Sequence, residues 1–410
     1  MILLLVLLAQ AKPVALTGGD VHTVTQGVHK GGTVLVKDGK IARVGTGFEL
    51  PEGTVRIDVT GKRVLPGFIA ARATGLGAGG GQGKIADALD PFHESIKVAL
   101  AGGLTSAFVE GGSSDGFFGG GGGNAPPSDA VVKMTYGTLD GMVLLEPASV
   151  SLAAWVRGSP SERHELREGL RRARAHLEDE RAFERRRSEG KLAAGEAPPK
   201  PSPAAERWLK LLRGEVVARI PAGDAEKIQK ALELLEEFRI RAVLTGVYEG
   251  WTLPDAIGRS RASCVFSVRG VKVHPERGAT RPSGSSIEQA AILRKAGVRF
   301  AIVPPGLDAG TGGIPGRDLG YLPMEAAFAI RGGLDEATAL EAITIRAAEA
   351  CGVETRIGSI EEGKDADLVV TDGDPFDYRT LVELTMVNGR VYYERSKSPA
   401  FSHLKEPSPK

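Results

Sequence analysis

The chain has little of what several classes of protein require. Its two cysteines, Cys264 and Cys351, are too few for a disulfide framework or a cysteine-based zinc site, and both lie among apolar residues. Lysine and arginine almost balance aspartate and glutamate, for a formal net charge of +1, which excludes nucleic acid or an acidic membrane as a partner held by bulk charge. The only long apolar run, residues 2–8, is too short to span a bilayer as a helix.

That apolar run is followed by Ala9-Gln10-Ala11, a small-residue pattern typical of a signal-peptide cleavage site. We therefore expect residues 1–11 to be a signal peptide and the protein to be exported, to the periplasm or the extracellular space. The alternative is a buried first strand or a start codon placed too early, and the protein would then be cytoplasmic.

The remaining length suits one large α/β barrel with a smaller β-domain. Asp38-Gly39 and Asn388-Gly389 each separate two β-rich runs and predict hairpins near the two ends of the chain. The segment between them alternates strand and helix patterns, as a parallel barrel requires. It includes a charged helix over 159–187, a Pro/Ala/Lys-rich linker over 190–205, and closing helices over 322–332 and 335–351.

The most informative stretch is Gly61–Gly75, GKRVLPGFIAARATG. It resembles the opening of the barrel in the amidohydrolase superfamily, V-x-P-G-[FL]-I-D-x-H-x-H, where the two histidines bind a divalent metal. The sequence keeps the frame from Val64 to Ile69 but has Ala70 in place of the aspartate. Arg72 and Thr74 stand in place of the two histidines.

The C-terminal part extends this resemblance. Ala339–Gly352 and Ser359–Pro375 are similar to the family phrases A-x-x-x-T-x-x-P-A-x-x-L-G and G-S-[IL]-x-x-G-[KY]-x-A-D-[LF]-V, with the imidazolonepropionase-like branch as the nearest pattern. The resemblance implies an amidohydrolase-like TIM (β/α) barrel over 66–355. It also implies a composite β-sandwich built from 12–65 and 356–396, with 397–410 as a tail.

The resemblance also implies where the family's other metal ligands would fall. The fifth-strand histidine position holds Pro221, the sixth-strand position holds Gly246, and the final aspartate position holds Pro304 or Pro305, with Asp308 a few residues late. Proline and glycine offer no side-chain ligand, and Arg72 would repel a cation. We therefore predict no catalytic residue, no metal ligand and no cofactor, although the family norm is zinc or another divalent metal.

The function that this pattern favours is a metal-free pseudoenzyme that serves as a binding, scaffolding or regulatory subunit. It would form a homo-oligomer or pair with an intact amidohydrolase paralogue. Arg72 predicts either a small anionic ligand or an internal ion pair with a nearby acid. The alternative is a hydrolase of non-peptide C–N bonds with an atypical metal site, which requires His93, His274 and Asp308 to converge at the barrel mouth.

Overall fold

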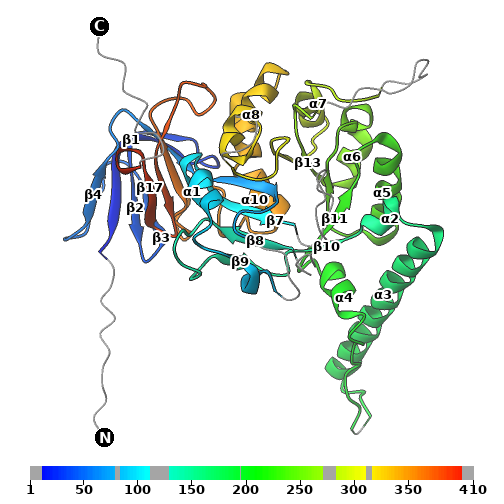
Figure 1. Cartoon of the computed structure of the whole chain (residues 1–410). Helices are drawn as coiled ribbons and strands as arrows, with labels where there is room; N and C mark the ends of the chain where they lie inside the picture. The colour runs from blue at the N-terminus through cyan, green and yellow to red at the C-terminus, as the bar shows by residue number, and fades with distance from the viewer. Residues whose placement is uncertain are drawn as a thin grey trace, which may run out of the picture.

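A computed structural model describes residues 12–78, 84–110, 129–193, 195–270, 283–310 and 316–398. Residues 1–11, the expected signal peptide, lie outside these ranges. The described chain forms an α/β barrel body with a separate sheet beside it, and this sheet contains both ends of the described chain (Figure 1). The expected fold class, an amidohydrolase-like barrel with an added β-structure from both termini, is confirmed.

The added sheet, here called the terminal sheet, is eight-stranded in the order β17-β16-β15-β5-β1-β2-β3, with β4 also paired to β1. It has its own apolar core, which includes Leu16, Val34, Leu368 and Met386. The strands are β1 (Val14–His22), β2 (Val28–Lys37), β3 (Lys40–Gly45), β4 (Val55–Asp58), β5 (Arg63–Pro66), β15 (Leu368–Thr371), β16 (Val382–Val387) and β17 (Arg390–Glu394).

Both expected hairpins are present in the terminal sheet. Asp38 and Gly39 join β2 to β3 with φ values of 50° and 77°, and Asn388 and Gly389 join β16 to β17 with φ values of 50° and 73°. Positive φ at both central residues is the conformation that two-residue hairpins of type I′ require. The two turns touch, because a Cβ at Gly389 would lie 2.9 Å from the Cα of Gly39.

The barrel strands fall into two sheets. In the first, β6 (Phe68–Ala73) and β7 (Leu104–Val109) are parallel, whereas β8 (Ala130–Lys133) and β9 (Val143–Leu145) run antiparallel. This antiparallel pair departs from the expected strictly parallel alternation. The second sheet is wholly parallel in the order β10-β11-β12-β13-β14. Its strands are β10 (Ser149–Ser151), β11 (Val217–Pro221), β12 (Ala242–Thr245), β13 (Ser263–Phe266) and β14 (Phe300–Ile302).

Inward-facing side chains from these strands fill the barrel, and a helix near the C-terminus closes one end. Ile69, Phe108, Val217 and Val243 belong to this interior cluster, together with alanines of α10. The helices are α1 (Glu94–Ala101), α2 (Ala153–Arg157), α3 (Pro160–Ser188), α4 (Glu206–Leu212), α5 (Ala225–Phe238), α6 (Pro254–Ser260), α7 (Gln289–Lys295), α8 (Leu322–Arg331), α9 (Glu336–Ala342) and α10 (Ile345–Cys351), with short 3₁₀ turns η1 (Ile85–Ala88), η2 (Gly250–Thr252), η3 (Leu319–Tyr321) and η4 (Arg395–Lys397).

The second closing helix predicted over 335–351 is in fact two helices, α9 and α10. The chain leaves helical geometry at Thr344, whose φ and ψ are −129° and −98°. The carbonyl of Ile343 accepts a hydrogen bond from the backbone N–H of Ile69 at 2.9 Å. In a continuous helix the Ile343 carbonyl would accept a hydrogen bond from the helix itself. Here it bonds β6 instead, so the helix is interrupted at this point.

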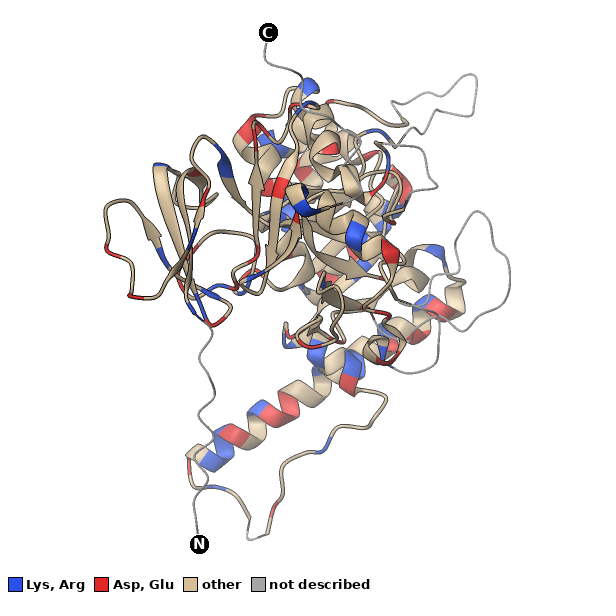
Figure 2. Ribbon diagram, turned by 60° about the vertical axis from the view of Figure 1, so that its left-hand side comes forward, with Lys and Arg blue, Asp and Glu red and all other residues tan. Residues whose placement is uncertain are grey.

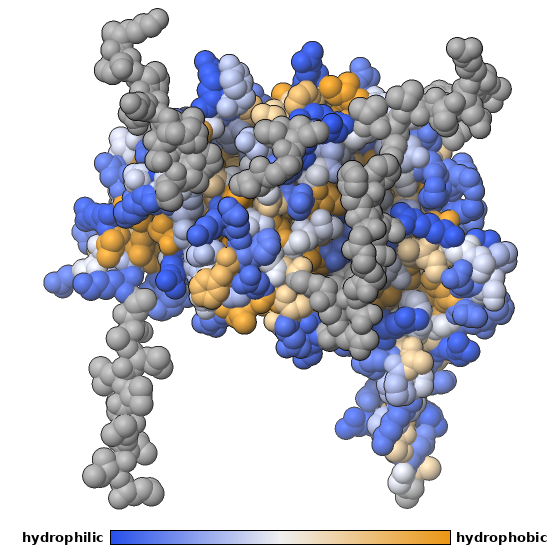
Figure 3. Space-filling view, in the orientation of Figure 1, coloured by the Kyte–Doolittle hydropathy of each residue, from blue (hydrophilic) through white to orange (hydrophobic). Residues whose placement is uncertain are grey.

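The helix α3 projects from the barrel body as an arm (Figure 1). It begins with a capping box, in which Ser159 accepts from the backbone N–H of Glu162 and Glu162 accepts from that of Ser159. Positive and negative residues alternate along it (Figure 2), and its surface is mainly hydrophilic (Figure 3). The described residues of the linker 190–205 form no helix or strand. Within the described ranges, no helix is long and apolar enough to cross a membrane.

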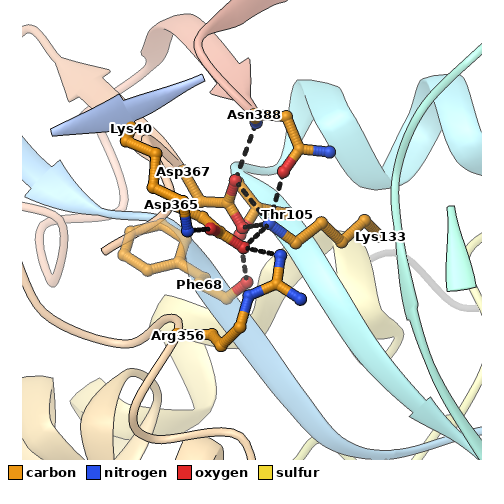
Figure 4. Close-up of polar contacts among 8 residues, drawn as sticks. All are labelled: Lys40, Phe68, Thr105, Lys133, Arg356, Asp365, Asp367 and Asn388. Atoms are coloured by element: carbon orange, nitrogen blue, oxygen red, sulfur yellow. Dashed lines mark hydrogen bonds and ion pairs between the residues drawn. The ribbon is translucent and has the colours of Figure 1, made fainter. Parts of the chain in front are cut away.

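A buried lysine joins the barrel to the terminal sheet (Figure 4). Lys133, at the end of β8, donates to Asp365 Oδ2 at 2.7 Å, to Asn388 Oδ1 at 2.6 Å and to Asp367 Oδ1 at 3.2 Å. Asp365 also accepts from Lys40 and Arg356, each at 2.6 Å. We call these residues the junction: Lys40, Lys133, Arg356, Asp365, Asp367 and Asn388.

Candidate functional site

The positions singled out in the sequence lie where strands end at one end of the barrel. Arg72 is near the end of β6, Pro221 ends β11, and Gly246 directly follows β12. Pro221 is paired with Thr245 in register, so the ends of β11 and β12 are neighbours. The carboxyl ends of parallel barrel strands form the mouth at which binding sites are built. We call this region the barrel mouth.

Arg72 and Gly246 meet across the barrel mouth. A Cβ built on Gly246 would lie 3.9 Å from Arg72 Nη1, the one contact within 4 Å that the described, non-neighbouring residues make with it. Arg72 Nε donates to Glu110 Oε1 at 2.8 Å, which is the internal ion pair expected as one alternative. Among the described residues, Nη1 and Nη2 of Arg72 have no hydrogen-bond or ion-pair partner. The pair with Glu110 therefore fixes the guanidinium and leaves its outer edge unused.

A second arginine, Arg219, lies beneath the mouth inside the barrel. Its Nη2 donates to the carbonyl of Ala71 at 2.7 Å, and its guanidinium carbon lies 3.4 Å from the centroid of the Phe108 ring. The residue is only 4% exposed, and its Nε and Nη1 have no hydrogen-bond partner among the described residues. Burial lowers the pKa of the Arg219 guanidinium from its ordinary value. Arginine nevertheless stays protonated in proteins, so this is a buried cation.

Glu110 is shared between the two arginines. Its Oε1 is bonded to Arg72 and lies 4.0 Å from Arg219 Nη1, a separation too long for a hydrogen bond. Asp129 also acts on Arg219 electrostatically, while its Oδ2 accepts from the hydroxyl of Ser149. Sequence reasoning missed Arg219 and Glu110. The available signal was an arginine within the apolar strand VARIP, two residues before Pro221.

The remaining candidates lie beside the mouth. The backbone N–H of Thr74 donates to the carbonyl of Leu307 at 2.6 Å, and a Cβ at Gly75 would lie 3.9 Å from that of Asp308. This contact brings Thr74 and the exposed Asp308 to neighbouring positions, while Pro304 is buried after β14. The carboxyl pKa of Asp318 is raised, mainly by burial and in addition by the negative charge of Asp308.

The hydrolase alternative requires His93, His274 and Asp308 to converge at the barrel mouth, and two of these three residues are described. His93 is the N-cap of α1, and its Nδ1 lies 2.7 Å from the hydroxyl of Ser95. His274 lies outside the described residues. The described residues contain no group of three or more histidines, cysteines, aspartates or glutamates that could hold a metal ion.

The described side chains at the mouth do not form a ligand set for a divalent cation. Pro221 and Gly246 supply no side-chain ligand, and the guanidinium of Arg72 lies next to the position of any side chain at 246. The cysteines offer no nucleophile either, because both are buried and burial raises the pKa of Cys264 and of Cys351 to about 12. What the described mouth can do is hold an anion on an oriented arginine.

Comparison with known proteins relates the chain to a superfamily. The model of the "Amidohydrolase family" matches residues 310–393. An amidohydrolase from Thermotoga maritima MSB8 of known structure is 26% identical, with a TM-score of 0.68 over 93% of this chain and 100% of that one. The chain is a member of the amidohydrolase superfamily.

Two further similarities add to this assignment. An imidazolonepropionase from Thermoplasma volcanium is 40% identical over 65 residues, which are 14% of this amidohydrolase-superfamily chain. The match covers only 16% of the length of that curated relative. Phenylurea hydrolase B has the same fold, with a TM-score of 0.56 and 17% identity over 95% of this chain and 98% of its own.

Proposed function

We propose that this amidohydrolase-superfamily protein is a metal-free pseudoenzyme that binds a small carboxylate at the barrel mouth and acts as a binding or regulatory subunit. The observation that carries the proposal is the position of Arg72. Its guanidinium is held by Glu110 through Nε, and its Nη1 lies 3.9 Å from the position that a Cβ at Gly246 would take.

A carboxylate is the ligand that matches this edge. The planar guanidinium presents paired N–H groups that carboxylates accept in bidentate fashion, with bonds stronger than those between neutral groups. Glu110 already holds the side chain in one orientation, so the ligand would not have to order it. Gly246 leaves room opposite the arginine, because Nη1 is the one atom of the described, non-neighbouring residues within 4 Å of its Cβ position.

The same features act against a metal. A divalent cation at the mouth would be repelled by Arg72 and by the buried charge of Arg219. In the described part of the mouth, Glu110 is already bonded to Arg72. A single shared carboxylate is a poor substitute for the several ligands that a zinc site requires.

The test is calorimetric titration of the full chain with acetate, succinate and inorganic phosphate, together with metal content by elemental mass spectrometry. We expect binding of a carboxylate that weakens at least tenfold in Arg72→Met. Arg63→Met is the matched control, because Arg63 also lies on a strand and pairs with Asp374 at 3.0 Å, far from the mouth. The control should leave binding unchanged.

About one tightly held metal per chain, with a higher melting temperature on zinc addition, would contradict the proposal. It would favour the alternative of a hydrolase of non-peptide C–N bonds with an atypical site. Equal carboxylate binding by Arg72→Met and by the unmodified chain would remove the anion site while leaving the metal-free proposal standing.

A regulatory subunit needs a partner, and we propose a homo-oligomer or a complex with an intact amidohydrolase paralogue. Sedimentation of the purified chain tests the first of these directly. A monomer at all concentrations would exclude self-association and leave the paralogue as the partner to be tested by co-sedimentation.

A further inference from the structure

A cavity lies at the boundary between the barrel and the terminal sheet. It has a volume of about 620 Å³ and is enclosed by α8, the end of α1 at Gly102 and the segment 371–382 that joins β15 to β16. Figure 1 shows this segment, in orange, beside α8. We propose that this cavity is a binding site for an amphipathic anion, a molecule with an acyl or aromatic body and one negatively charged end.

The apolar side chains that line the cavity match the apolar body of the proposed ligand. Phe68, Met324, Phe328, Phe376 and Leu381 all contribute to the wall. Tyr321 and Tyr378 stand at the same cavity and are 42% and 84% exposed, which is unusual for large aromatic side chains. Cavities of about 300–1,000 Å³ with mostly apolar walls and few polar groups are the usual sites for small organic ligands.

The charged residues around the cavity match the negatively charged end of the proposed ligand. The negative charge of Asp377 is balanced by Arg379. The Nε of Arg379 donates to the carboxylate at 3.0 Å, and this bond holds the pKa of the Asp377 carboxyl at about 2. Arg331, the last residue of α8, is exposed and lines the cavity. No described residue forms an ion pair or hydrogen bond with its side chain. The one unbalanced charge in the lining is therefore positive.

This site is separate from the barrel mouth. Phe68 is the first residue of β6, whereas Arg72 is four residues further along the strand, about 13 Å away at the rise of an extended chain. The lining contains neither Arg72 nor Arg219. The inference therefore does not depend on the proposed carboxylate site.

The test uses 8-anilinonaphthalene-1-sulfonate, an aromatic anion whose fluorescence rises in apolar surroundings, titrated into the full chain. We expect one saturable site from which decanoate displaces the probe at least tenfold better than decanol does. Arg331→Met should weaken probe binding about fivefold to tenfold, and Met324→Trp, which narrows the cavity, should weaken it as well. The matched control, Arg72→Met, should bind the probe as the unmodified chain does.

Several results would overturn the inference. Equal displacement by decanoate and decanol, or unchanged binding by Arg331→Met, would show that charge has no role. Loss of binding in Arg72→Met would place the probe at the barrel mouth. Binding that appears only in a variant ending at Ser398 would assign the cavity to residues 399–410, and binding lost as protein concentration rises would assign it to a second copy of the chain.

Discussion

The junction and the barrel mouth both place a cation among carboxylates in a buried part of the molecule, but they differ in how fully the donors are used. At the junction, Lys133 has three oxygen partners, and Asp365 has two further cations. At the mouth, Arg219 leaves Nε and Nη1 without described hydrogen-bond partners, although Nη1 lies 4.0 Å from Glu110 Oε1, and Arg72 uses only Nε among the described contacts.

This difference separates architecture from binding capacity. A buried network built on a lysine that uses all three of its N–H groups holds two parts of a fold in one arrangement, and removing a member leaves a buried charge unpaired. At the junction Asp367 Oδ2 accepts no hydrogen bond from a described residue, but it lies 3.0 Å from Lys133 Nζ as an ion pair. Donors without partners at a strand end contribute little to the fold and remain available to a ligand. Three measurements, in order of expected effect, test whether the two clusters differ in this way.

The largest effect is expected for Lys133→Met. The substitution leaves Asp365 and Asp367 buried without their shared cation, and breaking a buried ion pair from one side costs about 3–5 kcal/mol. Urea unfolding measures this loss. Lys40→Met is the matched control, because Lys40 binds the same Asp365 but its side chain is 48% exposed, so its loss should cost no more than about 1 kcal/mol. Equal losses would show that the junction is not a buried network.

A smaller effect is expected from acidification. Burial acts to raise the pKa of Asp365, but its bonds to Lys133 and Lys40 prevail and lower it to about 2, from 3.8 in the unfolded chain. Its contribution to stability is therefore complete above about pH 4 and is lost as the pH falls through 2.

Burial raises the pKa of Asp367, so protonation of Asp367 favours the folded state. The stability difference between Lys133→Met and the unmodified chain should therefore shrink between pH 4 and pH 2. Unfolding curves at several pH values measure this difference. A difference that stays constant over that range would show that Lys133 does not act through these carboxylates.

The smallest effect is expected for Arg219→Met. The variant loses the bond to the Ala71 carbonyl and the contact with Phe108, but it also removes a buried cation with two unpaired nitrogens. These terms offset each other, so the free energy of unfolding should change by less than about 1 kcal/mol. A loss as large as that of Lys133→Met would show that Arg219 is a structural residue.

The features that sequence alone could predict are those fixed by local chemistry. Asp38-Gly39 and Asn388-Gly389 determine their hairpins through backbone conformation, and Ser159 determines the start of α3 through its side chain. The antiparallel β8–β9 pair and the break at Thr344 were not predicted. Both depend on contacts between distant segments, such as the bond from Ile69 to Ile343.

The site was predictable only as a set of positions. Alignment to the family phrases located Arg72 and Gly246, and the structure brings them together. The same alignment gave no reason to consider Glu110, because it lies outside every quoted motif. Arg219 lies on the same strand two residues before Pro221, and none of the family's ligand positions falls on it. Which charges share a partner is a property of the folded barrel and is absent from any one segment.

The glycine at 246 also limits the mutational routes open to this protein. Gly246 has a φ of +67°, so a histidine there would have to adopt a backbone conformation that side chains rarely take. Its Cβ would also lie 3.9 Å from a guanidinium. A histidine introduced at 246 alone would therefore lie next to the guanidinium of Arg72, which repels a metal cation. Installing a cation ligand at position 246 would call for a change at position 72 as well.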